Sequence, residues 1–182
     1  MSEKYKFYDS ARLYFISFSV VHWIDVFIRN EYKYELLDSW RFCIKNKGLE
    51  IYSWCIMPSH VHMIVSSVKD PLSGIIRDMK SYTSRRIRKI IETSKAESRR
   101  EWMLKMMKES GFANKNNVDF QFWQQTNHPV ELDTNFLMDQ RLTYIHNNPV
   151  VAGFVDEPED WLFSSARDYC GKKGLIDIKF IG

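Results

Sequence analysis

Several features that define whole classes of protein are missing from this sequence. No apolar run approaches the ~20 residues that a membrane span needs, and the N-terminal residues MSEKYKFYDSARLYF contain no apolar core of signal-peptide length. We therefore expect a soluble, cytoplasmic protein without membrane contact. The three cysteines, Cys43, Cys55 and Cys170, include no Cys-x-x-Cys pair, and each lies among apolar or aromatic residues. This usage predicts reduced core thiols.

Signatures of nucleotide-binding and zinc-binding proteins are missing as well. The sequence has no phosphate-binding GxxxxGK loop, no GxGxxG after a predicted strand and no Cys/His spacing typical of zinc sites. It also has no acidic triad that suggests a two-metal nuclease, no internal repeat and no low-complexity tract. We therefore expect an activity that needs no nucleotide cofactor.

The sequence does contain enough apolar residues for one well-packed folding unit. Its 182 residues are 45% hydrophobic and 15% aromatic, which favours a single domain over residues 1–182. The formal net charge is only +3, but residues 72–110 contain 11 Lys and Arg against 5 Asp and Glu. This local excess favours an anionic partner such as a nucleic acid, although a basic helix is as often only a solvated surface.

Hydrophobic periodicity predicts an α+β fold. Alternation and a high content of β-branched and aromatic residues indicate strands at 13–21, 49–56, 60–66 and 119–125, and a strand-like end at 175–181. Apolar steps of three and four residues indicate helices at 31–47, from Pro71 onward, at 97–109, from Asp133 to Asn147 or Asn148, and at 164–169, with a loop at 111–117. Four or five strands with helices between them form a sandwich of sheet and helices.

Local signals predict where some of these elements end. Gly48 should end the first helix, Asp133 should cap the last long helix, and Pro149 should end it. A serine should cap the short C-terminal helix. Phe122 and Trp123 in the fourth strand could stack on unpaired bases, but aromatic residues in a strand are more often part of the core.

The turn after the second strand leads into the pattern with the clearest chemical meaning. The sequence WCIMPSHVHMIVSS, residues 54–67, places His60 and His62 two residues apart in a strand. Residues i and i+2 share a face of a strand, so both imidazoles project together while Val61 faces the other side. Two imidazoles on one face form half of a metal site, although two unrelated surface histidines would have the same spacing.

A second polar group lies on the predicted last long helix. Gln140, Tyr144 and Asn148 are four residues apart, so they lie one above the other on a single helix face. The group could be a locally satisfied tyrosine with Asn148 as a C-terminal cap. Opposite the two-histidine strand, however, two imidazoles and an amide oxygen can bind a divalent cation. The phenol of Tyr144 would then lie near whatever that cation polarises.

Together these motifs resemble those of a known protein family. WCIMPSHVHMIVS resembles the His-hydrophobic-His motif of the single-tyrosine HUH transposases. TYIHNNPVVAGFV, followed by W-x-x-SSARDY, resembles the tyrosine helix and tail of their REP-associated branch. The resemblance covers about Tyr14 to Tyr169, and the paired motifs in this order are far more specific than either alone. It divides the chain into a catalytic core at 13–169 and a C-terminal tail at 170–182.

The resemblance implies an HUH endonuclease fold, with a central antiparallel sheet of the ferredoxin-like type, that acts on single-stranded DNA hairpins with Mg²⁺ or Mn²⁺. It implies that His60 and His62 bind the metal, that Tyr144 is the nucleophile and that Asn148 is the third metal ligand. Other insertion-sequence relatives commonly have glutamine as the third ligand, so Asn148 departs from that pattern. The family forms a 5′-phosphotyrosine and frees a 3′-hydroxyl. The REP-associated branch implies a monomer, whereas related transposases form dimers that exchange the tyrosine helix.

The basic helix after Pro71 supplies the predicted DNA contacts, which are Arg77, Lys80, Arg85, Arg86, Arg88 and Lys89. Two alternatives remain open: a non-catalytic, domesticated DNA-binding protein that uses its basic helices alone, and a relaxase or replication-initiator nicking enzyme of the same fold. The presence of His60, His62 and Tyr144 argues against loss of catalysis. The short chain without a helicase domain argues against the initiators.

Overall fold

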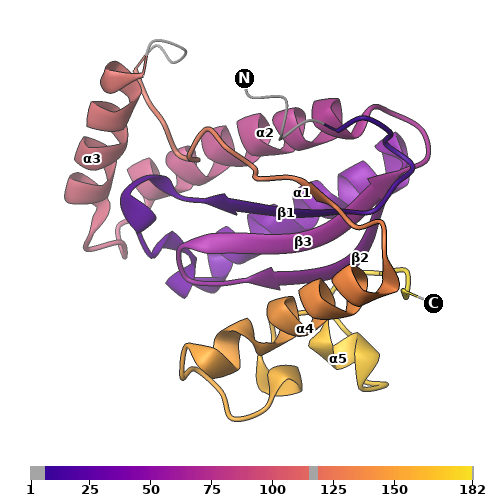
Figure 1. The fold of residues 1–182 in the computed structure, drawn as a ribbon. Coiled ribbons are helices and arrows are strands. Elements are labelled where there is room, and N and C mark those ends of the chain that lie inside the picture. The colour runs from indigo at the N-terminus through magenta and orange to yellow at the C-terminus, as the bar shows by residue number, and fades with distance from the viewer. Residues whose placement is uncertain (1–6, 115–118, 182) are drawn as a thin grey trace.

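The computed structural model describes residues 7–114 and 119–181, and its centre is a four-stranded antiparallel sheet (Figure 1). The strands lie in the order β2-β3-β1-β4, with β1 at Tyr14–Ser19, β2 at Leu49–Ile56, β3 at His60–Ser67 and β4 at Val130–Glu131. All three strand pairs are antiparallel. This order, with helices between the strands, confirms the predicted α+β fold with a ferredoxin-like sheet.

Helices of two kinds connect and flank the strands. The α-helices are α1 (Asn30–Lys47), α2 (Leu72–Thr93), α3 (Arg100–Ala113), α4 (Asn135–Val151) and α5 (Ala166–Tyr169), and the 3-10 helices are η2 (Val21–Trp23), η3 (Val26–Ile28) and η4 (Pro158–Asp160). Gly48 has a left-handed backbone with φ 74° and ends α1 as predicted, and a Cβ here would lie only 2.6 Å from Cβ of Lys69. Within the described residues, no helix combines the length and the apolar content that crossing a bilayer requires.

The hairpin of β2 and β3 places both candidate histidines on a central strand. Ile56 pairs with Val61, and the backbone N–H of Met57 donates to the carbonyl of His60 at 2.8 Å, which confirms the predicted turn. On its other side β3 pairs with β1, where Ser19 lies opposite His60. The backbone around the histidines is therefore held from both sides.

The two faces of the sheet are covered by different helices. Ile16 and Met63 face the larger core cluster, to which α1 and α2 contribute. Phe15 and Ile64 face the smaller cluster, where Ile145 of α4 packs. In Figure 1, α1 lies behind the sheet, α2 runs along its β1 side and α4 along its β2 side. Because side chains alternate along a strand, the even-numbered residues of β3 share the face of α4.

The strand predicted at 119–125 is wrong. This segment makes only an isolated bridge between Val20 and Trp123, whereas β4 forms later in the chain. Phe122 and Trp123 are 1% and 5% exposed, and Trp123 stacks on Phe27 with ring centroids 5.6 Å apart. Trp123 Nε1 also donates to Thr83 Oγ1 at 3.1 Å. The alternating aromatic pattern therefore reflects core packing, as the interpretation of these rings as core residues predicted, and not a strand.

Both predicted ends of the last long helix need correction. Thr134, not Asp133, is the N-cap of α4, and its Oγ1 accepts from the Leu137 N–H at 3.3 Å. Pro149 does not end the helix, which continues to Val151. A residue before proline is disfavoured in the helical region but not barred from it, and a proline removes only one helical N–H bond.

The C-terminal predictions were only partly correct. The short helix α5 exists, and Ser164 Oγ accepts from the N–H of its first residue, Ala166, at 3.1 Å, whereas Ser165 Oγ accepts from the Trp54 N–H at 2.9 Å. Residues 175–181 form no strand, although the Lys179 N–H donates to the carbonyl of Ile51 in β2. Cys170 is exposed, unlike the two buried cysteines, so it is not a core thiol.

The loop predicted at 111–117 is also corrected where it is described. Helix α3 continues to Ala113, so residues 111–113 are helical. Asn114 follows the helix with an extended backbone, as the loop prediction requires, and residues 115–117 lie outside the described residues.

Candidate functional site

The imidazoles of His60 and His62 lie next to each other on the α4 face of the sheet. Their ring centroids are 4.8 Å apart, and the planes are inclined by 74°. The ring of Phe15, on the neighbouring strand β1, stacks on His62 at 5.7 Å. The spacing of two residues along β3 therefore places both imidazoles together, as the sequence predicted.

His62 is buried without any hydrogen-bond partner. It is 5% exposed, and neither Nδ1 nor Nε2 has a partner among the described residues. Burial, with smaller contributions from the charges of His60 and Arg141, lowers the pKa of His62 to about 3. The ring is therefore neutral at pH 7. A neutral buried imidazole with two unsatisfied nitrogens needs a ligand that the described residues do not supply.

His60 contacts both a turn residue and the tyrosine helix. Its Nδ1 and Ser59 Oγ hydrogen-bond at 3.2 Å. Burial lowers the pKa of His60, and the nearby side chain of Asn148 partly opposes this. Asn148 on α4 therefore lies beside a histidine of β3, as the sequence predicted.

Tyr144 completes this cluster from the same helix. Its ring is 5.1 Å from the ring of His62 and 6.0 Å from that of Phe15, with both contacts edge-to-face. The side chain is 44% exposed, so solvent and a ligand can reach it. Gln140, one turn earlier, is exposed, and no hydrogen bond or ring contact joins it to the histidines in the described part of the chain. Two of the three polar residues on this predicted helix face therefore reach the histidines.

The donor set fits a divalent metal with open coordination positions. Across residues 7–114 and 119–181, no group of three or more His, Cys, Asp or Glu side chains is placed to hold a metal. His60, His62 and Asn148 instead offer two imidazole nitrogens and an amide oxygen. The unsatisfied nitrogens of His62 are the structural observation that favours a bound cation.

The cations predicted to contact DNA lie on α2, in the layer on the other face of the sheet. Four of them already have protein partners: Arg77 binds Asp78, Arg86 binds Glu35, Arg88 binds Glu92, and Lys80 binds Gln124 and Asn127. Arg85 and Lys89 are exposed, and no described carboxylate forms an ion pair with either. The structure does not bring these six cations to the histidines.

Lys80 differs most from its predicted environment. Its Nζ donates to the carbonyl of Gln124 at 2.8 Å and to Oδ1 of Asn127 at 2.6 Å. Burial lowers its pKa to about 8. The ammonium group therefore holds the segment beside β1 rather than facing solvent.

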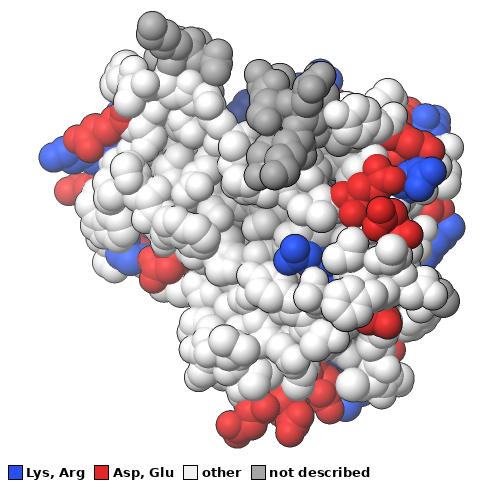
Figure 2. Space-filling model, in the orientation of Figure 1, with Lys and Arg blue, Asp and Glu red and all other residues white. Residues whose placement is uncertain are grey.

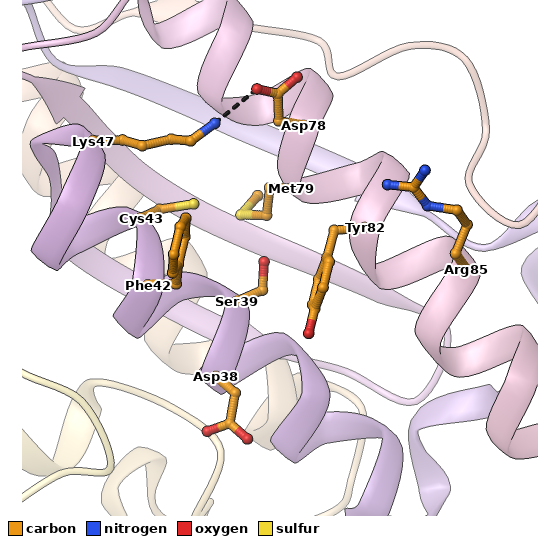
Figure 3. A pocket seen from close by; sticks show the side chains of 9 residues that line it. All are labelled: Asp38, Ser39, Phe42, Cys43, Lys47, Asp78, Met79, Tyr82 and Arg85. Carbon is orange, nitrogen blue, oxygen red and sulfur yellow. Dashed lines mark hydrogen bonds and ion pairs between the residues drawn. The ribbon is translucent and has the colours of Figure 1, made fainter.

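A separate cavity of about 530 Å³ lies between α1 and α2 (Figure 3). Phe42 and Tyr82 stand on its two sides, and the ion pair of Lys47 with Asp78 crosses one end. Arg85 reaches its border. The cavity is not lined by His60, His62, Tyr144 or Asn148, which together form the histidine cluster. This cavity is therefore not the candidate site.

The face of the molecule on which α4 lies in front of the sheet is shown in Figure 2. Charged side chains are sparse over the middle of this face, and acidic side chains gather along its lower rim and at its upper right. The segment after α4 contains four acids, Asp156, Glu157, Glu159 and Asp160.

Three residues of the site were missed from the sequence. Phe15 contacts His62 and Tyr144, and Trp23 of η2 lies edge-to-face with His60 at 5.3 Å. Arg141 lies on α4 three residues before Tyr144, and its Cζ is 4.8 Å from the ring of Phe15. The helical spacing to Tyr144 was the only available signal for Arg141, and none existed for the two aromatic residues.

Comparisons with known proteins bear on the family and the fold. Residues 24–148 match the family model described as "Transposase IS200 like". A structure of a REP-associated tyrosine transposase bound to a REP hairpin is 20% identical, covers 100% of this chain and 92% of its own, and has a TM-score of 0.67. A provisionally named transposase from Deinococcus radiodurans R1 is 16% identical, with coverage of 80% and 97% and a TM-score of 0.46. A comparison with curated protein sequences finds no match.

The matched residues span more than half of the chain. They include both histidines of β3 and the tyrosine and asparagine of α4. The protein therefore belongs to the IS200-like transposase family and is a DNA transposase.

Proposed function

We propose that this transposase cleaves and rejoins single-stranded DNA at hairpin sequences through a covalent link to Tyr144. The observation that carries the proposal is the contact of an exposed phenol with a buried, unsatisfied imidazole. Tyr144 is 44% exposed and lies 5.1 Å from His62, ring to ring. Asn148, one helical turn later, lies close enough to His60 to affect its pKa. A nucleophile and a metal-ligand set thus meet on one side of the sheet.

His60, His62 and Asn148 are the residues that would hold a single Mg²⁺ or Mn²⁺ ion. When bound, such a cation supplies Lewis-acid stabilisation of the charge on the phosphate oxygens. The low pKa of His62 keeps this ring in the neutral form that metal binding requires. Phe15, stacked on His62, limits the orientations of the ring.

Tyr144 would supply the nucleophilic oxygen. A bond forms between its Oη and the scissile phosphorus while the bond from phosphorus to the 3′-oxygen breaks. The phenolic proton leaves to solvent and the 3′-oxygen takes up a proton, so the products are a 5′-phosphotyrosine and a free 3′-hydroxyl. The number of phosphate ester bonds does not change, and rejoining needs no nucleotide cofactor.

The proposed substrate is a DNA hairpin with a single-stranded flank. The REP-associated transposase that shares this fold was captured with a REP hairpin, and its fold covers the whole of this chain. Arg85 and Lys89, which are exposed and have no described ion-pair partner, are proposed to contact phosphates away from the scissile bond. Because α4 packs on β2 and β3 of its own chain, we propose that the protein acts as a monomer.

The role of the Tyr144 phenol as the nucleophile can be tested with a substitution and a matched control. Tyr144→Phe removes one oxygen, so it should keep hairpin binding and lose both strand cleavage and the covalent adduct. Tyr82→Phe is the control, because Tyr82 is 45% exposed but lies on α2, on the other side of the sheet. The measurement is a denaturing gel of each variant with a labelled single-stranded hairpin and Mn²⁺.

An adduct that persists in Tyr144→Phe would contradict the assignment of the nucleophile. Cleavage by the unmodified protein without any adduct would mean that water, and not tyrosine, attacks. Tight binding without cleavage under Mg²⁺ and Mn²⁺ would support a DNA-binding protein that has lost its chemistry.

A further inference from the structure

The guanidinium of Arg141 lies in the candidate site, and no hydrogen-bond acceptor for it is found among residues 7–114 and 119–181. Its Cζ is 4.8 Å from the ring centroid of Phe15, and its Nε is buried and unpaired. No carboxylate among the described residues forms an ion pair with it. A guanidinium has five N–H donors in a planar fork that matches the oxygens of a phosphate or a carboxylate. Unused donors on a partly buried arginine therefore indicate an anion as the missing partner.

Two arginines that join separate segments of the fold, Arg29 and Arg99, have carboxylate partners. Arg99 binds both Asp25 and Glu97, and Arg29 binds Glu97 as well. The buried carboxylate of Glu97 thus satisfies two guanidinium groups at once. Arg141 has only an aromatic ring beneath it, which fixes the plane of the guanidinium but uses none of its N–H donors.

Arg141 and the proposed nucleophile share one region of α4. Residues three apart on a helix are neighbours, so Arg141 lies one turn before Tyr144. The ring of Phe15 contacts Arg141, His62 and Tyr144, with centroid distances of 4.8, 5.7 and 6.0 Å. The charge of Arg141 also contributes to lowering the pKa of His62, after burial and the effect of His60. The shared contact with Phe15 and the helical spacing to Tyr144 therefore place the guanidinium beside the site.

The chemistry of phosphoryl transfer explains why a fixed cation is useful there. A phosphodiester has one negative charge, and charge on its non-bridging oxygens must be stabilised as the attacking oxygen approaches. The residues proposed as nucleophile and metal ligands are a phenol, an amide and two imidazoles, none of which carries a permanent positive charge. Arg141 can supply one and cannot lose its proton at neutral pH.

We propose that Arg141 is a catalytic residue that binds a non-bridging oxygen of the scissile phosphodiester. This inference rests on the proposed function of Tyr144. As the bond from Tyr144 Oη to phosphorus forms and the bond to the 3′-oxygen breaks, the guanidinium keeps all its protons and only donates hydrogen bonds. The same contact would hold the phosphate of the 5′-phosphotyrosine until the 3′-hydroxyl attacks in the reverse direction.

The test combines a substitution with a change in the substrate. Arg141→Gln should slow formation of the covalent adduct by roughly 100-fold, the effect of losing one preorganised donor. Hairpin affinity should change less than about threefold, because most phosphate contacts lie elsewhere. Arg41→Gln is the control, since Arg41 is exposed on α1 and bonds Asp38 and the carbonyl of Leu175. Its adduct rate should equal that of the unmodified protein.

A hairpin with an uncharged methylphosphonate at the cleaved linkage separates a direct contact from a structural role. If Arg141 touches that phosphate, one methylphosphonate diastereomer should slow the unmodified protein much more than it slows Arg141→Gln. If the substitution and the methylphosphonate instead reduce the rate by independent factors, Arg141 acts through packing and the inference is wrong.

The controls also separate this inference from the proposed function. If the unmodified protein forms no adduct, the proposed function fails. If it forms one and Arg141→Gln reacts within threefold of its rate, only the role of Arg141 fails. Should Arg141→Gln melt early, Arg141→Lys is measured instead. Lysine keeps the charge but not the fork, so its adduct should form more slowly than that of the unmodified protein, and an unchanged rate would overturn the proposal.

Discussion

The buried, unpaired nitrogens of His62 reduce the stability of the fold but are suited to binding a ligand. Its ring is 5% exposed, and both nitrogens are buried without partners. Leaving a buried polar group unsatisfied costs about 1–3 kcal/mol. Folded proteins tolerate such costs mainly at functional sites, where the missing partner arrives with the ligand.

This cost leads to a prediction for His62→Phe. Phenylalanine keeps a ring that can stack on Phe15 but removes both unsatisfied nitrogens. The variant should therefore unfold at the same temperature as the unmodified protein or a higher one when no metal is present. Mn²⁺ at about 100 times its dissociation constant should stabilise the unmodified protein by about 2.7 kcal/mol, a rise of several degrees, and should not stabilise the variant.

Thermal unfolding with and without Mn²⁺ measures both effects. Tyr144→Phe serves as the control, because it keeps all three proposed ligands and should keep the full rise. An equal rise for His62→Phe would place the metal elsewhere. A large loss of stability without metal would show that the nitrogens of His62 are satisfied in the folded protein.

Among single residues, the sequence predicts which ones share a face of one strand or helix. It does not predict contacts that depend on how separate elements pack. The two-residue step from His60 to His62 and the four-residue step from Tyr144 to Asn148 each fix a shared face. The contact of Phe15 with His62 depends on how β1 pairs with β3, which the spacing does not specify. The buried position of Lys80 depends on the 124–127 segment in the same way.

Helix α4 is the element that brings the nucleophile to the histidines, and His146 fixes its position. The Nε2 of His146 lies 2.9 Å from Ser165 Oγ and 3.2 Å from Ser53 Oγ. Its ring also packs edge-to-face on Tyr169 of α5. The tyrosine helix is thus tied to β2 and to the C-terminal segment by a buried polar network.

The C-terminal segment shows why one element was misassigned. Residues 175–181 alternate as a strand does, and β2 lies at the edge of the sheet. Phe163 and Ser165 already bond that edge through Ile56 N–H and the Trp54 carbonyl. Only one further backbone bond, from Lys179 to Ile51, joins the later described residues to it. Local alternation could not reveal that the edge was already occupied.

Helix α2 yields a prediction about salt. Arg85 and Lys89 are exposed without described ion-pair partners, so phosphates can neutralise them. Arg85→Gln with Lys89→Gln should weaken hairpin binding and reduce the slope of log affinity against log salt by about 0.7 for each phosphate that the variant no longer neutralises. Lys105→Gln with Lys108→Gln on α3 is the charge-matched control and should change the slope less.

Titration of a labelled hairpin at several salt concentrations gives these slopes. Equal slopes for the two double variants would mean that the basic face of α2 is only solvated. Loss of the adduct in the α2 variant, with binding intact, would mean that these cations act on chemistry and not on affinity.

In the whole molecule, the candidate site and the basic residues of α2 lie on different faces of the sheet. The histidine cluster lies on the α4 face of the sheet, while α2 lies on the other face beside the cavity that it forms with α1. The sequence predicted both groups but not their separation, because the strand order that sets it is a property of the assembled sheet. DNA that touched both would have to pass around the β1 side.

The fold also predicts how defective copies behave when mixed. Tyr144 and His62 of one chain already meet at 5.1 Å, so a complete site needs no second copy. A mixture of His62→Phe and Tyr144→Phe proteins should therefore form no adduct, even at high concentration. If the mixture regains activity, the tyrosine helix is exchanged between chains and the monomer proposal is wrong. Each variant alone is the control.

The most direct test of the central claim is to locate the covalent bond. The unmodified protein is incubated with a single-stranded hairpin and Mn²⁺, digested, and analysed by mass spectrometry. The proposed chemistry predicts a nucleotide joined through its 5′-phosphate to the peptide that contains Tyr144, and an equal amount of DNA ending in a free 3′-hydroxyl. A nucleotide on any other tyrosine, or a bond through a 3′-phosphate, would contradict it.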